Sequence, residues 1–171
     1  MTGALPAYRD DGLVNVIVET PKGSIAKFKF DGASGLMMLS RPLPSGVAYP
    51  YDWGYIPGTR AADGDPLDTI VIWEGASFPG ILIPCRLVSV LRVEQTNRES
   101  GNRERNDRVL AVPAKAPRLQ AVQGLGDVSE RLRTELEHFF QAAVAFEGKD
   151  VSMLGWGDMD DAAATVKAAL L

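Results

Sequence analysis

The sequence contains almost none of the residues that build disulfides or imidazole sites. Among its 171 residues there is one cysteine, Cys85, and one histidine, His138. A single cysteine excludes an internal disulfide, and a single histidine excludes a site built from several imidazoles. Cys85 follows an apolar run, so we expect a core residue in a strand rather than a nucleophile. Segment 1–6 lacks the basic and apolar regions of a signal peptide, which with the lone cysteine indicates the cytoplasm.

Long apolar runs and an excess of positive charge are also missing. No apolar run reaches the ~18 residues of a membrane-spanning helix. The formal net charge of −4 argues against a general nucleic-acid binder, which needs a basic face. Hydrophobic residues make up 46% of the chain and charged residues 23%, as in ordinary globular proteins. At this length we expect one domain over residues 1–171 with a substantial core.

Short β-like segments with glycine and proline between them dominate the first two thirds of the chain. The expected strands are 13–19, 25–31, 36–41, 69–73, 80–93 with an interruption at Pro84, and 109–112. Such a series predicts a closed barrel or a sandwich. The period then changes: Ser129 is the expected N-cap of a helix to about residue 146, and 158–161 opens a second helix. The pattern predicts an α+β, mainly β fold with helices packed at one side.

Segment 94–108 contains no apolar residue and mixes charges of both signs. One interpretation is a solvated loop between two strands. The other is a flap over a functional site. The pattern alone leaves both open.

The acidic turn Asp63-Gly64-Asp65-Pro66-Leu67-Asp68 is the most informative motif. It places three carboxylates within six residues, and glycine and proline turn the backbone between them. Carboxylates held this close raise one another's pKa unless a cation lies among them. Their oxygens suit a hard divalent cation such as Mg²⁺. The turn is therefore either a metal site or a solvated acidic turn, since D-G and D-P pairs are common turn formers.

The residues before this turn extend it into a longer pattern. In order, they are Glu19, Lys27, Arg41, Tyr49-Pro50 and Gly54-Tyr55-Ile56-Pro57. Together with the turn they resemble the soluble family I inorganic pyrophosphatases, almost without gaps from about residue 14 to 70. Weaker matches continue through 110–113, 137–140 and 155–156. The resemblance implies a five-stranded, OB-like closed barrel flanked by two C-terminal helices.

The resemblance also implies an activity, Mg²⁺-dependent hydrolysis of inorganic pyrophosphate to two phosphates, and a role for each matching residue. Asp63 and Asp68 would bind metal ions, Glu19 would serve a further metal through water, and Asp65 would orient or deprotonate the attacking water. Phosphate oxygens would be held by Lys27, Arg41 and Tyr49, with Tyr49 alternatively positioning the acids. From the residues alone, Lys27 and Arg41 also fit solvated surface positions, and Tyr49 and Tyr55 fit the core, which we favour for Tyr55. Bacterial members of the family are commonly hexamers, so we expect a homo-oligomer, with His138 near subunit contacts.

The sequence departs from the family at several functional positions. The resemblance implies an acid and a tyrosine where the chain has Lys29 and Trp53. It implies two metal-binding aspartates, one near Gln95 or Gly101 and one where the chain has Asn106. It also implies a lysine where the chain has Arg108, and a Tyr-Lys pair where the chain has Ala143 and Val144. Acids at Glu94, Glu99, Glu104 or Asp107 are candidate substitutes. We therefore expect fewer bound metals, and more of the phosphate charge met by Lys27, Lys29, Arg41 and Arg108.

Three outcomes follow from these departures. Pyrophosphate hydrolysis could persist at a reduced rate, because losing one transition-state donor commonly costs ~10²–10³ in rate. The substrate could shift to a larger diphosphate ester. Alternatively, the chain could be a non-catalytic relative that binds a phosphorylated ligand or a partner protein.

Overall fold

The computed structural model describes residues 5–171, so residues 1–4 of the N-terminal segment discussed above lie outside the described part. The strands are β1 (Val14–Thr20), β2 (Ala26–Asp31), β3 (Leu36–Pro42), β4 (Asp52–Ile56), β5 (Leu67–Val71), β6 (Leu82–Thr96), β7 (Arg103–Arg105), β8 (Arg108–Pro113) and β9 (Ser152–Gly157). The two α-helices are α1 (Glu130–Ala143) and α2 (Met159–Ala168). Two short 3-10 helices, Pro117–Leu119 and Leu125–Asp127, lie before α1.

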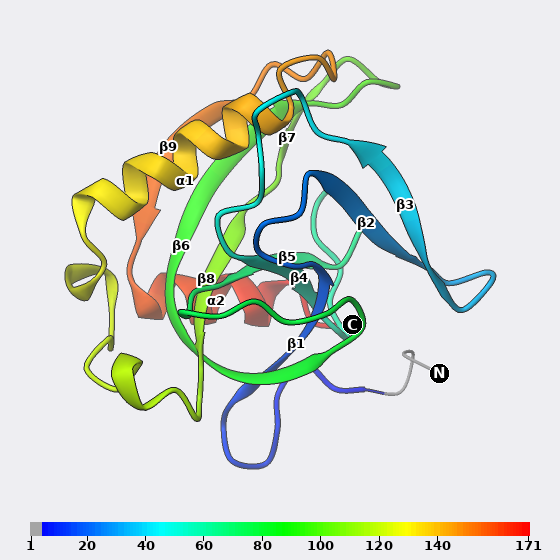
Figure 1. Cartoon of the computed structure of the whole chain (residues 1–171). Coiled ribbons are helices and arrows are strands. Elements are labelled where there is room, and N and C mark those ends of the chain that lie inside the picture. Colours follow the sequence, from blue (N-terminus) through cyan, green and yellow to red (C-terminus); the bar gives the residue numbers. More distant parts are fainter. Residues whose placement is uncertain (1–4) are drawn as a thin grey trace.

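Five strands form a closed ring of backbone pairing in the order β1-β4-β5-β8-β6, and β6 returns to pair with β1 (Figure 1). All neighbours in the ring are antiparallel except β5 and β8, which run parallel. The predicted mainly β fold, with an OB-like ring and two C-terminal helices, is confirmed. Ring closure leaves few unpaired strand edges, which otherwise favour aggregation.

The two helices cover different parts of the ring because each has one apolar face. Leu136, Phe139, Phe140 and Ala143 of α1 are buried in a core cluster with side chains of β4, β6 and β8, and Leu132 is partly buried there. Ala162 and Val166 of α2 are buried in a second cluster that contains Cys85. Cys85 is fully buried and free, as predicted for a core residue.

Both helix starts follow their capping residues. The Ser129 hydroxyl oxygen accepts a hydrogen bond from the Leu132 amide at 3.2 Å. Asp158 and Asp161 form a reciprocal capping box at the start of α2, with N···O distances of 2.9 and 3.0 Å. The predicted starts are confirmed, whereas α1 ends at Ala143 and not near residue 146.

The polar segment 94–108 is mostly a hairpin and not a loop. β6 continues to Thr96 and pairs with β7, so that Glu94 faces Arg105 and Thr96 faces Arg103. Arg103 of β7 forms an ion pair of 3.1 Å with Glu94 of β6, and it donates a hydrogen bond to Ser152 Oγ of β9 at 2.8 Å. Charge pairing and backbone hydrogen bonds stabilise this hairpin without an apolar face. The predicted interruption at Pro84 is also wrong, because β6 runs through it: the register pairs Pro84 with Asn15, and its carbonyl accepts from the Ala114 amide at 2.9 Å.

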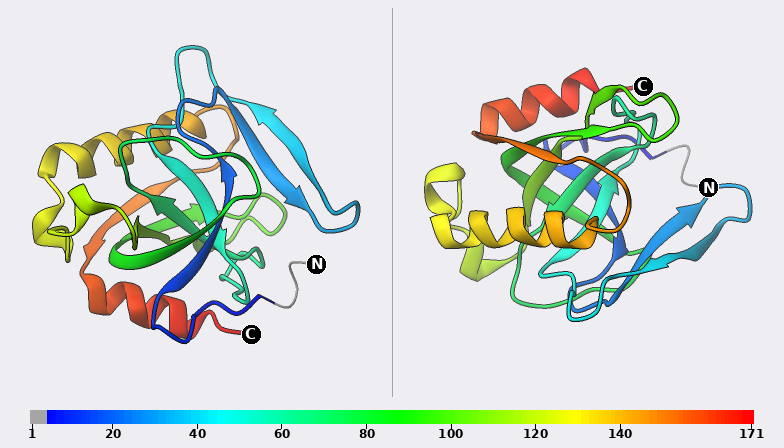
Figure 2. Two further views of the ribbon diagram at one scale, coloured as in Figure 1. Left: turned by 60° about the horizontal axis from the view of Figure 1, so that its bottom comes forward. Right: turned by 90° about the horizontal axis from the view of Figure 1, so that it is seen from above.

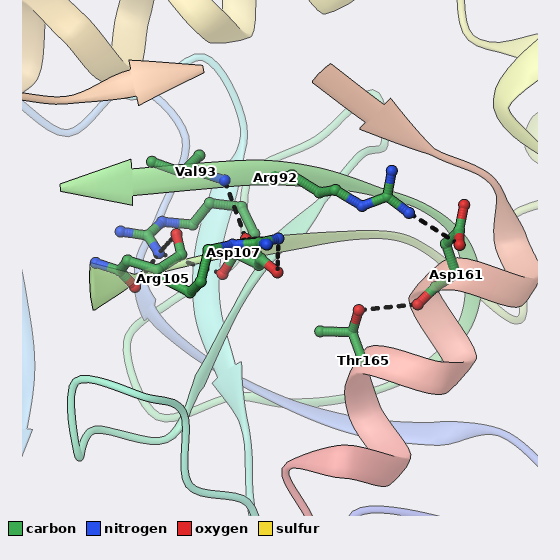
Figure 3. Close-up of polar contacts among 8 residues, drawn as sticks. Arg92, Val93, Arg105, Asp107, Asp161 and Thr165 are labelled. Carbon is green, nitrogen blue, oxygen red and sulfur yellow. Dashed lines mark hydrogen bonds and ion pairs between the residues drawn. The ribbon is translucent and has the colours of Figure 1, made fainter. Parts of the chain in front are cut away.

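Polar contacts connect the C-terminal part of β6 to Asp107, between β7 and β8, and to α2 (Figure 3). Asp107 accepts from the Val93 amide at 3.0 Å and from Arg105 at 2.8 Å. On the other side of β6, Arg92 pairs with Asp161 of α2 at 2.9 Å. The Asp107 carboxylate is thus occupied by the Val93 amide and the Arg105 guanidinium.

The β2–β3 hairpin forms a separate two-stranded sheet that projects beside the ring, away from both helices (Figure 2). Thr20 at the end of β1 attaches it, because its hydroxyl exchanges hydrogen bonds with the backbone of Phe28 at 3.0 and 3.2 Å. These hydrogen bonds hold the hairpin beside the ring. In the described part of the chain, neither helix has the length and apolar character needed to cross a membrane.

Candidate active site

Two adjoining cavities lie between the β2–β3 hairpin, the ring and α1. The first, of about 400 Å³, contains the carboxylates of Glu19, Asp63, Asp65 and Asp68 in its wall, and we call it the acidic cavity. The second, of about 600 Å³, contains six basic residues and two acidic ones in its wall, and we call it the basic cavity. Lys27, Lys29, Trp53, Asp68, Arg108 and Lys149 line both. All nine residues predicted for the site line one or both cavities: Glu19, Lys27, Lys29, Arg41, Tyr49, Asp63, Asp65, Asp68 and Arg108.

Strand register explains how these residues meet. Thr69 of β5 and Val109 of β8 are partners in the parallel pair, so the residues before them, Asp68 and Arg108, lie side by side. On the hairpin, Lys27 of β2 faces Arg41 of β3 across the antiparallel pair.

The acidic turn places Asp63 and Asp65 just before β5. Gly64 adopts φ +88°, a conformation that side-chain-bearing residues disfavour, and its amide donates to the Ala61 carbonyl at 3.0 Å. The Asp65 amide donates to the Asp63 carboxylate at 3.1 Å. This short turn directs the carboxylates of its two aspartates into the acidic cavity.

Three of the basic side chains already hold acids of the site. Lys29 Nζ lies 3.0 Å from Asp65 Oδ2, Arg108 Nη1 lies 2.9 Å from Asp68 Oδ2, and Arg41 Nε lies 3.4 Å from Glu147 Oε1. The first pair is well exposed, and such pairs contribute little to stability. The Arg108 side chain is only 6% exposed, so its pair with Asp68 is the strongly held one.

Arg108 is the most constrained cation of the site. Its guanidinium lies 4.7 Å from the ring centre of Phe140 and 5.9 Å from that of Trp53. Its Nη1 also donates to the Asn106 carbonyl at 2.6 Å. Its Nε is buried and has no hydrogen-bond partner among residues 5–171.

Burial and mutual repulsion shift the pKa values of the site. Burial raises the pKa of Asp63, and the neighbouring Asp68 and Asp65 add to the rise. Burial likewise raises the pKa of Glu19, although the Phe30 amide donates to it at 2.8 Å. Burial lowers the pKa of Lys27. The acids and the lysine are thus poorly solvated, which makes a ligand of opposite charge favourable to each.

Other charged groups change the balance at Lys29 and Tyr49. Burial opposes the charge of Lys29, but the hydrogen bond and attraction to Asp65 outweigh it and raise its pKa. Burial raises the pKa of Tyr49 to about 12, so this phenol stays protonated near neutral pH. Tyr49 packs edge-on against Trp53 and lies 4.9 Å from Phe139, between ring centres. Tyr49 is therefore both a core aromatic and part of the wall of the basic cavity. Tyr55 is buried, as favoured above, and lines the acidic cavity.

The fit to a metal ion is partial. The acidic cavity offers four carboxylates, whose oxygens suit a hard divalent cation, and a bound cation would relieve the raised pKa values of Asp63 and Glu19. However, no three acidic, cysteine or histidine side chains of the described residues converge closely enough to form a ready-made metal site. Asp65 and Asp68 each direct one oxygen to a basic side chain and keep the other available.

The structure also identifies residues that sequence reasoning missed or misjudged. Arg98, Lys149, Gln95 and Glu147 line the basic cavity, and each comes from a turn, loop or strand end without a local motif. The acids considered as substitute ligands, Glu94, Glu99, Glu104 and Asp107, line neither cavity. That suggestion is therefore wrong, because Glu94 and Asp107 pair with arginines and Glu104 accepts from Asn97 at 2.9 Å.

A mainly β ring whose mouth combines clustered carboxylates with lysine and arginine side chains defines a class of proteins suited to phosphate-containing anions. Comparison with known proteins is more specific. Residues 16–171 match the family model described as inorganic pyrophosphatase, and the chain belongs to this family. It is 39% identical to an inorganic pyrophosphatase of Synechocystis sp. over 91% of this chain and 89% of the relative, and 37% identical to one of Nostoc sp. over 97% and 95%. The crystal structure of inorganic pyrophosphatase from Thermus thermophilus superposes with a TM-score of 0.90 at 34% identity, covering 98% of this chain and 95% of that one.

Proposed function

We propose that the chain hydrolyses inorganic pyrophosphate to two phosphates in a Mg²⁺-dependent reaction. The observation that carries this proposal is the placement of the Asp63–Asp68 carboxylates opposite Lys27, Arg41 and Arg108 around two joined cavities. Carboxylates can hold a cation and activate water, and basic side chains can stabilise charge on a transferring phosphoryl group. The similarity to inorganic pyrophosphatases over most of the chain supports the same conclusion.

In this reaction Asp65 orients the attacking water and takes its proton. Its ion pair with Lys29 is well exposed, so the carboxylate can exchange this partner for a water molecule readily. Lys27 and Arg41, which face each other across the hairpin, hold phosphate oxygens. Arg108 and the protonated Tyr49 hydroxyl contribute further hydrogen bonds from the wall of the basic cavity.

Asp63 and Asp68, with Glu19 through water, are the residues that would hold Mg²⁺. The bound ion supplies charge neutralisation and a lowered pKa for water. Because Arg108 occupies one Asp68 oxygen, we expect fewer metal ions here than a site with free carboxylates would hold. The wall formed by Ala143 and Val144 offers the substrate no polar side chain, so we also expect a reduced turnover.

The test is phosphate release from pyrophosphate with and without Mg²⁺, in the unchanged protein and in Asp65→Asn. We expect Mg²⁺-dependent release that falls at least ~10²-fold in Asp65→Asn, since a positioned base contributes about 10²–10⁴ in rate. Asp160→Asn is the matched control, because Asp160 is exposed on α2 and lines neither cavity. Phosphate release that does not require Mg²⁺ would contradict the proposal. Equal rates in the unchanged protein and in Asp65→Asn would contradict it as well.

A second candidate function is favoured by the ion pairs themselves. With Asp65 and Asp68 both held by cations, the site could bind a phosphorylated ligand or partner protein without turning it over. Calorimetry with pyrophosphate would then show binding while no phosphate is released at any Mg²⁺ concentration. Full Mg²⁺-dependent turnover excludes this alternative.

We further propose a cytoplasmic homo-oligomer, and a hexamer on family resemblance. The lone cysteine is free and buried, in keeping with a reducing compartment. Leu36, Met38 and Leu39 of β3 are each more than half exposed, a surface that another subunit would bury. Light scattering coupled to size-exclusion chromatography measures the oligomeric state directly.

A further inference from the structure

The basic cavity carries positive charge that the fold leaves uncompensated. Its wall contains Lys27, Lys29, Arg41, Arg98, Arg108 and Lys149 but only two acids, Asp68 and Glu147. The chain as a whole has a formal net charge of −4. Concentrating cations in one concave place of an acidic protein attracts anions to that place.

Only half of these cations have an acidic partner. Lys29, Arg41 and Arg108 pair with Asp65, Glu147 and Asp68. The others, Lys27, Arg98 and Lys149, make no ion pair with any residue from 5 to 171. They belong to three separate segments: Lys27 to β2, Arg98 to the turn between β6 and β7, and Lys149 to the loop between α1 and β9. They therefore surround the cavity from different sides.

Two residues of the same wall each have a buried polar atom without a hydrogen-bond partner in the described chain. Gln95 is 3% exposed and Arg108 is 5% exposed, and Gln95 Oε1 and Arg108 Nε make no hydrogen bond within the described chain. Leaving a buried polar atom unpaired costs about 1–3 kcal/mol. Both atoms are covered by other atoms of the chain, so a phosphate oxygen reaches them only where the wall of the cavity shifts.

We propose that Arg98 and Lys149 clamp a condensed phosphate in the basic cavity, so that the anion binds without any metal ion. The proposal rests on the proposed function for the class of ligand, but it separates binding from hydrolysis. Lys27 and Arg108 complete the contacts, while the side chains of Ala143 and Val144 in the same wall add none that is polar. Mg²⁺ is then needed for the hydrolytic step and not for capture of the anion.

The experiment measures binding of imidodiphosphate, a pyrophosphate analogue with a nitrogen bridge that resists hydrolysis, by titration calorimetry in excess EDTA. We expect binding to the unchanged protein in EDTA that weakens as salt is raised, because screening reduces the attraction of exposed charges. The double variant Arg98→Gln with Lys149→Gln should bind roughly 10- to 100-fold more weakly, as expected for losing hydrogen bonds between charged groups. The matched control is Lys115→Gln with Arg118→Gln, which removes the same charge from exposed positions that line neither cavity.

Two results would overturn the clamp. One is binding that requires Mg²⁺ in the unchanged protein. The other is an equal loss in the clamp variant and the control variant, which would show an effect of net charge alone. Thermal unfolding of each variant establishes that it is folded. Phosphate release is assayed separately, so a protein that binds the analogue in EDTA but releases no phosphate would refute the proposed hydrolysis while upholding the clamp.

Discussion

At the scale of single residues, Asp52 shows how a buried carboxylate serves structure and not catalysis. It is fully buried at the start of β4 and accepts hydrogen bonds from Trp73 Nε1 at 2.8 Å, the Lys22 amide at 2.8 Å and the Ser77 amide at 3.1 Å. These donors come from two separate segments, the connection between β1 and β2 and the connection between β5 and β6. Asp52 therefore ties the chain before β2 and the chain after β5 to the ring.

Replacing Asp52 by alanine should destabilise the protein by about 3 kcal/mol or more, because several buried donors lose a charged acceptor. Urea unfolding followed by circular dichroism measures the change in the free energy of unfolding. Asp160→Ala, at an exposed position, is expected to change it by less than about 0.5 kcal/mol. A loss below about 1 kcal/mol for Asp52→Ala would show that water replaces the carboxylate.

Lys29 governs how the acidic cavity receives a metal ion. Its ammonium lies 3.0 Å from Asp65 and adds positive charge to the wall of the acidic cavity, where it would repel a divalent cation. Lys29→Glu removes this competitor and adds a ligand, so the affinity for Mg²⁺ should rise at least ~10-fold. Calorimetric titration of Mg²⁺ into metal-free protein measures the effect, with Lys29→Gln as the intermediate case. Equal Mg²⁺ affinities in all three proteins would mean that the charge at position 29 does not act on the metal site.

At the scale of elements, β4 and β1 approach each other closely at Gly54. Gly54 lies so near β1 that a Cβ atom there would stand 2.0 Å from the Ile17 carbonyl oxygen and 2.8 Å from Val18 Cα. Both atoms belong to a buried backbone that cannot move without breaking strand pairs. The glycine is thus required for the ring to close at this point.

Gly54→Ala should therefore cost more than about 3 kcal/mol, or leave the protein insoluble, since overpacking against a fixed backbone exceeds the usual range. Gly32→Ala is the control, because a Cβ there meets no atom within 4 Å and its φ is not positive. Urea unfolding and the soluble yield are the measurements. Similar stabilities for both variants would show that β1 and β4 can separate without loss.

Elements with an apolar period were predictable, whereas those stabilised by other forces were not. The valine- and isoleucine-rich β1 and the amphipathic α1 lie close to their expected positions. β4 was missed because it is buried on both faces and rich in aromatic and glycine residues, which hides the alternation. The β6–β7 hairpin was missed because ion pairs stabilise it in place of an apolar face.

The same distinction applies to the site. The acidic turn and the basic residues of β2 and β3 could be found from their spacing. Arg98 and Lys149 could not, since only the folded chain brings a hairpin turn and a loop after α1 to the same cavity. A sequence motif is a local spacing of residues, and neither Arg98 nor Lys149 belongs to one.

At the scale of the whole molecule, the arrangement of charge lets the chain fold without a metal ion. Two acids of the acidic cavity, Asp65 and Asp68, have built-in counter-ions, and Glu147 has Arg41. These ion pairs reduce the repulsion among the carboxylates before any cation binds. Removal of Mg²⁺ should consequently affect catalysis much more than stability.

Thermal unfolding in EDTA and in saturating Mg²⁺ checks this expectation. For a chain of 171 residues, 1 kcal/mol corresponds to about 2–4 °C in Tm, and we expect a difference no larger than that. In Arg108→Gln, Asp68 loses its buried partner, so Tm in EDTA should fall by several degrees and Mg²⁺ should restore part of the loss. A large Mg²⁺ effect on the unchanged protein, or none on Arg108→Gln, would show that the internal ion pairs do not substitute for the metal. The first result would place metal binding within the folding reaction itself, as in small zinc domains, and the built-in cations would then serve the ligand alone.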